Sequence, residues 1–173
     1  MKTKIPILIL LLATVMTTAF SQEKTRKELK EEKKLEDQKR IETIVNGKEF
    51  TFSPRTALPS GMKSVNISTN NNFVKFHPDL VESNMPFFGR GYGASGYGND
   101  TGLKFKGKPE TFTVEKETKT FVIEVSVKGE TDYFKLLLSV GFEGNASLSI
   151  TSNNRSTMSY EGEIIATVKP ENK

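Results

Sequence analysis

The stretch TFVIEVSVKGETDYFKLLLSV, residues 120–140, decides the fold class of this chain. On both sides of the polar turn KGETD, apolar side chains occupy every second position: Phe121, Ile123, Val125 and Val127 before it, then Phe134, Leu136, Leu138 and Val140 after it. A period of two places these side chains on one face of an extended strand. Two such runs joined by a short turn that contains glycine are typical of a β-hairpin.

The same alternation recurs before and after this hairpin. It is present in KEFTF (48–52), SVNIS (64–68), FVKF (73–76), ETFTVE (110–115), SLSI (147–150) and the segment 160–168. Polar or glycine-bearing turns separate these short runs, which is typical of an antiparallel sandwich or barrel. Parallel β-α units are excluded because the chain leaves no room for crossover helices. We therefore expect a mainly β domain over residues 46–170, a single antiparallel sandwich or a barrel-like meander of about 8–10 strands.

The first residues, MKTKIPILILLLATVMTTAFS (1–21), have the pattern of a secretory signal peptide. Two lysines form a basic start, an apolar run follows, and the small residues Ala19 and Ser21 precede an expected cut before Gln22. The apolar run is shorter than the roughly 20 residues that span a bilayer, so we expect cleavage rather than a membrane anchor. The mature protein should then be periplasmic or secreted, with no transmembrane segment.

Residues 22–45 are expected to form a charged helix in front of the β domain. The segment 23–43 carries eight basic and seven acidic side chains and no glycine or proline, and Glu, Lys and Leu favour a helix. Its few aliphatic residues do not repeat over several heptads, so a coiled coil is not expected. Asn46–Gly47 then either ends the helix with a left-handed residue or forms a tight hairpin turn between IETIV and KEFTF.

Several classes of chemistry lack the residues they need. There is no cysteine, so disulfides, thiolate metal sites and cysteine nucleophiles are excluded. The single histidine, His77, has no second histidine or cysteine with which to complete a metal site. The formal net charge of +4 falls to about +2 without the two lysines of residues 1–21, which is too small to predict binding to nucleic acid. No G-x-S-x-G elbow is present. We therefore expect no catalytic residue, no metal and no cofactor.

The segment MPFFGRGYGASGYGND, residues 85–100, is the most distinctive part of the sequence. Residues 91–96 match G-x-G-x-x-G, but the glycine-rich sequence that follows cannot open the helix that binds pyrophosphate in a dinucleotide site. The match is therefore coincidental. In a structural interpretation, glycines provide positive φ or close backbone approach, with the tyrosines packed between strands. These glycines are Gly89, Gly91, Gly93, Gly96 and Gly98.

A second interpretation makes this segment a ligand-binding surface. Phe88, Tyr92 and Tyr97 would provide stacking faces, while Arg90 and Asp100 would form a polar edge that orients the ligand. Such a surface suits a glycan and a peptide equally. The sequence does not distinguish this interpretation from the structural one.

Three stretches of the chain resemble a known family. They are FTFSPRTALPSG (50–61), NISTNNNFVKFHPDLVESNMPFFGRGYGASGYG (66–98) and the run from GLKFKGKPETF to MSYEGEI (102–164). The chain resembles the domain of unknown function 4251 found in exported proteins of Bacteroidetes, over most of residues 40–168. Pro86–Arg90, with the glycines that follow, is the most specific part of the likeness. The family implies export to the periplasm and a mostly β fold, and it assigns no activity and no residue roles.

From these observations we expect an exported, non-catalytic envelope protein. It would act as a binding or interaction module for a glycan, a peptide or an envelope protein partner. The alternatives are a purely structural envelope protein and, less favoured, a hydrolase that acts on cell-wall or glycan material.

Overall fold

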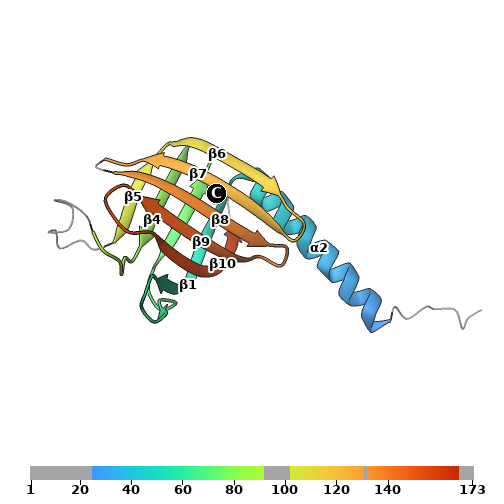
Figure 1. The fold of residues 1–173 in the computed structure, drawn as a ribbon. Helices are drawn as coiled ribbons and strands as arrows, with labels where there is room; N and C mark the ends of the chain where they lie inside the picture. Colours follow the sequence, from blue (N-terminus) through green and yellow to red (C-terminus); the bar gives the residue numbers. More distant parts are fainter. Residues whose placement is uncertain (1–24, 92–101, 131, 168–173) are drawn as a thin grey trace, which may run out of the picture. The chain divides into compact units, whose positions relative to one another are not determined.

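The computed structural model describes residues 25–91, 102–130 and 132–167 of the chain, and Figure 1 shows its ribbon. A helix, α2 (Arg26–Gly47), comes before the strands. The strands are β1 (Phe50–Pro59), β2 (Val65–Asn66), β3 (Phe73–His77), β4 (Leu80–Met85), β5 (Leu103–Gly107), β6 (Pro109–Lys116), β7 (Thr120–Lys128), β8 (Tyr133–Gly141), β9 (Asn145–Ser152) and β10 (Met158–Ala166). Their pairings are antiparallel. The expected mainly β, antiparallel fold with a charged N-terminal helix is confirmed.

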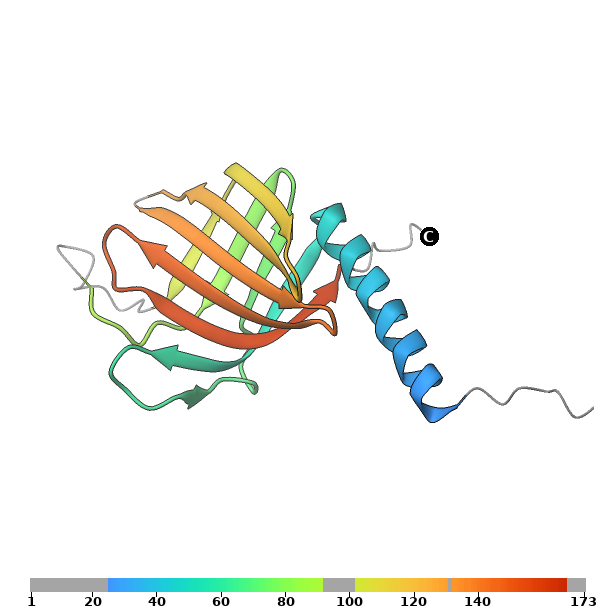
Figure 2. The ribbon, with the colours of Figure 1, turned by 45° about the vertical axis from the view of Figure 1, so that its right-hand side comes forward.

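The strands form a single sheet in the order β5-β4-β3-β1-β10-β9-β8-β7-β6, with the short β2 paired to β1 beside this path. The two end strands, β5 and β6, are consecutive in the chain and are separated by Lys108 alone. Gly107 pairs with Val81 of β4, whereas Pro109 pairs with Val127 of β7. One continuous segment therefore joins the two ends of the sheet, which curls into a nearly closed barrel (Figure 2). Of the two expected architectures, the barrel-like one is observed.

Gly107 is the point at which this closing segment changes neighbours. A Cβ atom at Gly107 would lie 2.7 Å from the carbonyl oxygen of Lys128 and 2.8 Å from Val127 Cγ1. Because a real side chain does not fit that close to backbone, glycine lets the segment pass from β4 to β7. Pro109 then begins β6, at the start of an edge strand, where its missing N–H group is tolerated.

The barrel interior is filled by side chains from alternate strand positions. The eight alternating apolar residues of the hairpin, from Phe121 to Val127 and from Phe134 to Val140, are all buried, as their period predicts. Aromatic rings also stack inside: the centroids of Phe50 and Phe76 are 4.8 Å apart, and those of Phe105 and Phe134 are 4.0 Å apart. Burying one such ring contributes about 1.5–3 kcal/mol. This apolar core therefore holds together a fold that has no disulfide.

Only part of α2 contributes to this core. The chain divides between Lys33 and Lys34 into two units, and the second contains every strand and the last turns of the helix. Ile41 and Val45, one helical turn apart, are buried in the core, whereas the side chains of residues 25–36 are exposed. Among the described residues, no helix combines the length and apolar character that crossing a membrane requires.

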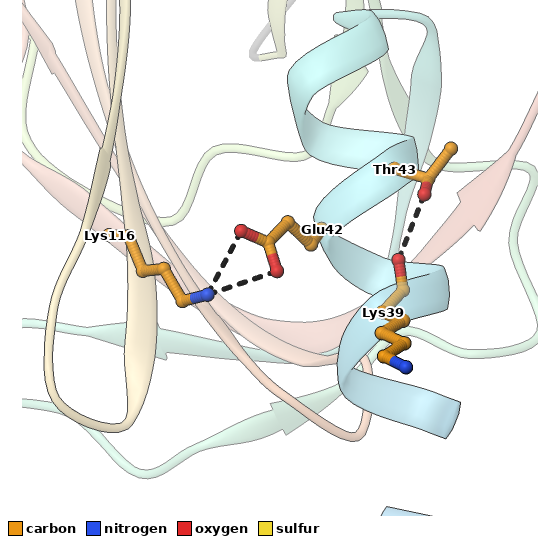
Figure 3. A network of polar contacts seen from close by, with 4 residues as sticks. All are labelled: Lys39, Glu42, Thr43 and Lys116. Atoms are coloured by element: carbon orange, nitrogen blue, oxygen red, sulfur yellow. Dashed lines mark hydrogen bonds and ion pairs between the residues drawn. The ribbon is translucent and has the colours of Figure 1, made fainter. Parts of the chain in front are cut away.

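Two polar contacts fix the end of α2 to the edge strand β6. Lys116 Nζ lies 2.9 and 3.0 Å from the two carboxylate oxygens of Glu42 (Figure 3). Lys48, just after the helix, has a left-handed backbone with φ of 56°, and its Nζ donates a hydrogen bond to the carbonyl oxygen of Phe112 at 2.7 Å. The hairpin alternative at Asn46–Gly47 is wrong because IETIV lies within the helix. The left-handed residue is one position later than expected.

Candidate functional site

The segment Pro86–Arg90 leaves β4 and lies against the start of β10 and the turn before it. The anchor inside the barrel is Tyr160, whose side chain is fully buried and whose hydroxyl donates a hydrogen bond to the carbonyl oxygen of Pro86 at 2.6 Å. Burial raises the pKa of the Tyr160 phenol well above its ordinary range. The phenol therefore keeps its proton, and remains a donor, at any physiological pH.

Ser156 holds the next part of the segment. The backbone N–H of Arg90 donates to Ser156 Oγ at 2.9 Å, and the N–H of Ser156 donates back to the carbonyl oxygen of Arg90 at 2.9 Å. A side chain at Gly89 would collide with Ser156 Oγ and would lie 2.8 Å from Cζ of the Phe87 ring. Glycine at position 89 therefore leaves room for the Ser156 hydroxyl and the Phe87 ring, which both lie close to the backbone there.

Arg155 connects the two ends of the stretch 92–101. On one side, its backbone forms an antiparallel bridge with Gly91, and its guanidinium lies over the ring of Phe87 at 5.4 Å. On the other side, its guanidinium NH1 donates a hydrogen bond to the carbonyl oxygen of Gly102 at 2.5 Å. Arg155 and Ser156 together therefore fix the residues from which this stretch departs and to which it returns.

The residues proposed from the sequence fall into two groups. Phe88 is half-buried and packs against the core, whereas Arg90 is exposed and Gly91 lies at the bridge to Arg155. Six other proposed residues lie outside the described residues, so both interpretations of the segment stay predictions there. They are Tyr92, Gly93, Gly96, Tyr97, Gly98 and Asp100.

Sequence reasoning missed three residues at this end of the barrel: Arg155, Ser156 and Tyr160. Arg155 ends the sequence SNNR (152–155), one of the polar turns between the strand runs, and Tyr160 fits the alternation of an ordinary core position. Their partners lie far away in the sequence, so no local spacing marks them.

The side chain of Arg90, unlike the other side chains of this segment, is not used to hold the fold together. Within the described part of the chain, no residue hydrogen-bonds to it or pairs with it, although its backbone N–H and carbonyl are both held by Ser156. A guanidinium presents five N–H donors in a rigid plane, which matches a carboxylate, phosphate or sulfate group. The arrangement can therefore present a cation to solvent from a fixed backbone.

The single histidine, His77, has both ring nitrogens in contact with other residues of the protein. Its Nε2 lies 3.3 Å from Glu49 Oε1, and its Nδ1 accepts a hydrogen bond from the backbone N–H of Asp79 at 3.2 Å. In the described ranges, no group of three His, Asp or Glu side chains is placed to hold a metal ion.

The fold, together with the anchored segment Pro86–Arg90, defines the class of the protein, which is a small, mainly β, barrel-like module. The chain belongs to the family of the domain of unknown function DUF4251, whose model matches residues 32–164. A crystal structure of a DUF4251 family protein from Bacteroides eggerthii DSM 20697 is similar, with a TM-score of 0.60 and 16% sequence identity. The similarity covers 75% of this chain and 87% of that one, and it shows the fold. Comparison with curated proteins finds no match.

Proposed function

We propose that this protein is an exported, non-catalytic binding module that contacts its ligand through Arg90. One observation carries the proposal: Arg90 has an anchored backbone and a guanidinium without a partner among the described residues. The other members of Pro86–Arg90 all contribute to the fold. Pro86 accepts the bond from Tyr160, Phe87 lies under Arg155, Phe88 packs on the core, and Gly89 fits against Ser156.

The fixed backbone matters for affinity. Binding is weakened by the cost of ordering flexible groups, and a contact residue with a preorganised backbone reduces that cost. Arg90 would pair with an acidic group of a glycan or peptide, with half-buried Phe88 offering an apolar surface beside it. Tyr92, Tyr97 and Asp100 are the further contacts that the sequence proposes.

A binding screen tests this proposal. Acidic and neutral glycans and peptides are immobilised, and the mature chain is compared with Arg90→Ala and Arg90→Lys. We expect an acidic ligand that binds the unchanged chain. Its affinity should fall with Arg90→Lys, and it should fall by about tenfold or more with Arg90→Ala. Arg55→Ala is the matched control, since Arg55 is also exposed but pairs with Glu163 at 3.4 Å on the outer sheet face.

The outcome must be separated from loss of folding. Because the Arg90 side chain is exposed, Arg90→Ala should change the free energy of unfolding by less than about 0.5 kcal/mol. If no acidic ligand distinguishes Arg90→Ala from Arg55→Ala, the proposed contact is wrong.

Export and periplasmic or secreted localisation form part of the proposal and rest on the signal-peptide pattern of residues 1–21. The intact mass of the protein recovered from its native cell envelope should correspond to a chain that begins at Gln22 or within a residue or two. Recovery of the full-length chain from the membrane fraction would contradict cleavage.

A further inference from the structure

A groove lies at the opposite end of β10 from Arg90. Its volume is about 680 Å³, which is within the range of protein ligand pockets. Three elements of the second unit form it: the last turns of α2, the turn between β8 and β9, and the end of β10. The lining residues are Arg40, Ile41, Thr43, Ile44, Glu143, Gly144, Glu163, Ile164, Ile165 and Ala166.

The floor of the groove is apolar. It includes the end of the outward face of β10, which is polar along the rest of the strand. Along β10 the outward positions are Ser159, Glu161 and Glu163, and then Ile165, which is 51% exposed. Ile44 of α2 is half-buried and faces the same groove. An isoleucine that interrupts a polar face beside a second apolar side chain offers a surface that an apolar group could cover.

The rim of the groove is negative. Glu143 is exposed, and no residue of the described ranges pairs with it. Glu163 forms an ion pair with Arg55, which is not part of the groove lining. The last turn of α2 contains no basic residue that could offset these carboxylates. Arg40 is the cation in the lining, and Asp37 lies 3.3 Å from it.

We propose that this groove docks a segment of a partner protein in which apolar side chains alternate with lysine or arginine. The apolar side chains would cover Ile165 and Ile44, and the basic ones would pair with Glu143 and Glu163. An acidic peptide or an anionic membrane surface would be repelled by the same carboxylates. A second copy of the chain would bring the same negative rim against itself. This surface is separate from Arg90, so the two proposals stand or fall independently.

Two short synthetic peptides test the proposal by NMR titration of the isotope-labelled mature chain. In both peptides, which have blocked ends, isoleucine alternates with a charged residue. The charged residues are three lysines in one peptide and three glutamates in the other. We expect the lysine peptide to shift the amide signals of Gly144, Ile165 and Ala166 and the glutamate peptide to shift none of them. Ile165→Ser and Glu143→Gln should each weaken binding of the lysine peptide by about fivefold.

Leu137→Ser is the matched control, because Leu137 is an exposed aliphatic residue, 43% accessible, on the outer face of β8. It should bind the lysine peptide like the unchanged chain. The proposal is overturned if neither peptide shifts these signals at millimolar concentration, if both bind equally, or if Leu137→Ser weakens binding as much as Ile165→Ser. A dimer that Ile165→Ser dissociates in sedimentation would also overturn it in favour of a second copy.

Discussion

The hydroxyl of Tyr160 donates a 2.6 Å hydrogen bond to the carbonyl oxygen of Pro86, which is 74 residues away in the sequence. The bond joins the interior of β10 to the first residue of the segment that carries Arg90. It thereby ties the most distinctive part of the sequence to the core of the barrel.

Replacing Tyr160 with phenylalanine should destabilise the fold. The ring still fills its place in the interior, but the Pro86 carbonyl loses its donor, which costs about 1–3 kcal/mol. Denaturant midpoints of the two proteins measure this loss. Tyr133→Phe is the control, because the Tyr133 hydroxyl makes no hydrogen bond with the described residues, and it should change little. Equal effects of the two changes would show that the bond to Pro86 does not matter.

Stability should also fall in alkali because of Tyr160. Burial raises the pKa of its phenol above the ordinary value of 10.0, so the folded chain keeps a proton that the unfolded chain loses. The stabilisation is complete below about pH 10 and is lost as the pH rises towards the folded-state pKa. Urea midpoints between about pH 9 and pH 11 should therefore fall more steeply for the unchanged chain than for Tyr160→Phe. Parallel curves would contradict this assignment.

Gly89→Ala should destabilise the barrel end that holds Arg90. The new methyl group would collide with Ser156 Oγ, which accepts the hydrogen bond from the Arg90 N–H, and would press on the Phe87 ring. We expect a loss of about 1–3 kcal/mol. At Gly47, by contrast, a Cβ would meet nothing within 4 Å, so Gly47→Ala should be neutral or slightly stabilising. The melting temperatures of the two variants test this. A loss with Gly89→Ala alone indicates the local collision, whereas equal losses would mean that the collision at Gly89 is not the cause.

The fold was largely predictable because strand alternation is a local signal. The hairpin of β7 and β8 repeats it without a break, and its partner strands lie next to each other in the chain. β4 was missed because its sequence LVESNM buries Ser83 and points Leu80 outward, which hides the alternation. Ser83 is tolerated inside because its hydroxyl donates to the carbonyl oxygen of Leu103 at 2.8 Å. β5 was missed as a short run between glycines.

The candidate site was less predictable than the fold. The sequence marks Pro86–Arg90 as distinctive, but its anchors come from β10 and the turn before it. A serine and an arginine in a polar turn have no signature that points to a partner more than 60 residues away. Gly107 shows the same limit, since its need for glycine arises from contact with Lys128 on β7. Such requirements arise from contacts between segments that are distant in the sequence, and neither composition nor hydrophobic periodicity reveals these contacts.

The final prediction concerns how much of α2 the barrel needs. Residues 25–36 are exposed, so deleting residues 22–38 removes few apolar contacts and should change the free energy of unfolding by less than about 1 kcal/mol. Ile41→Ala should instead cost about 2–5 kcal/mol, because Ile41 is 1% exposed and packs beneath the turn at Gly144. Leu35→Ala, at a position that is 52% exposed, is the control and should have almost no effect. Denaturant unfolding of the three variants measures these differences. A deletion as costly as Ile41→Ala would show that the charged half of the helix stabilises the barrel after all.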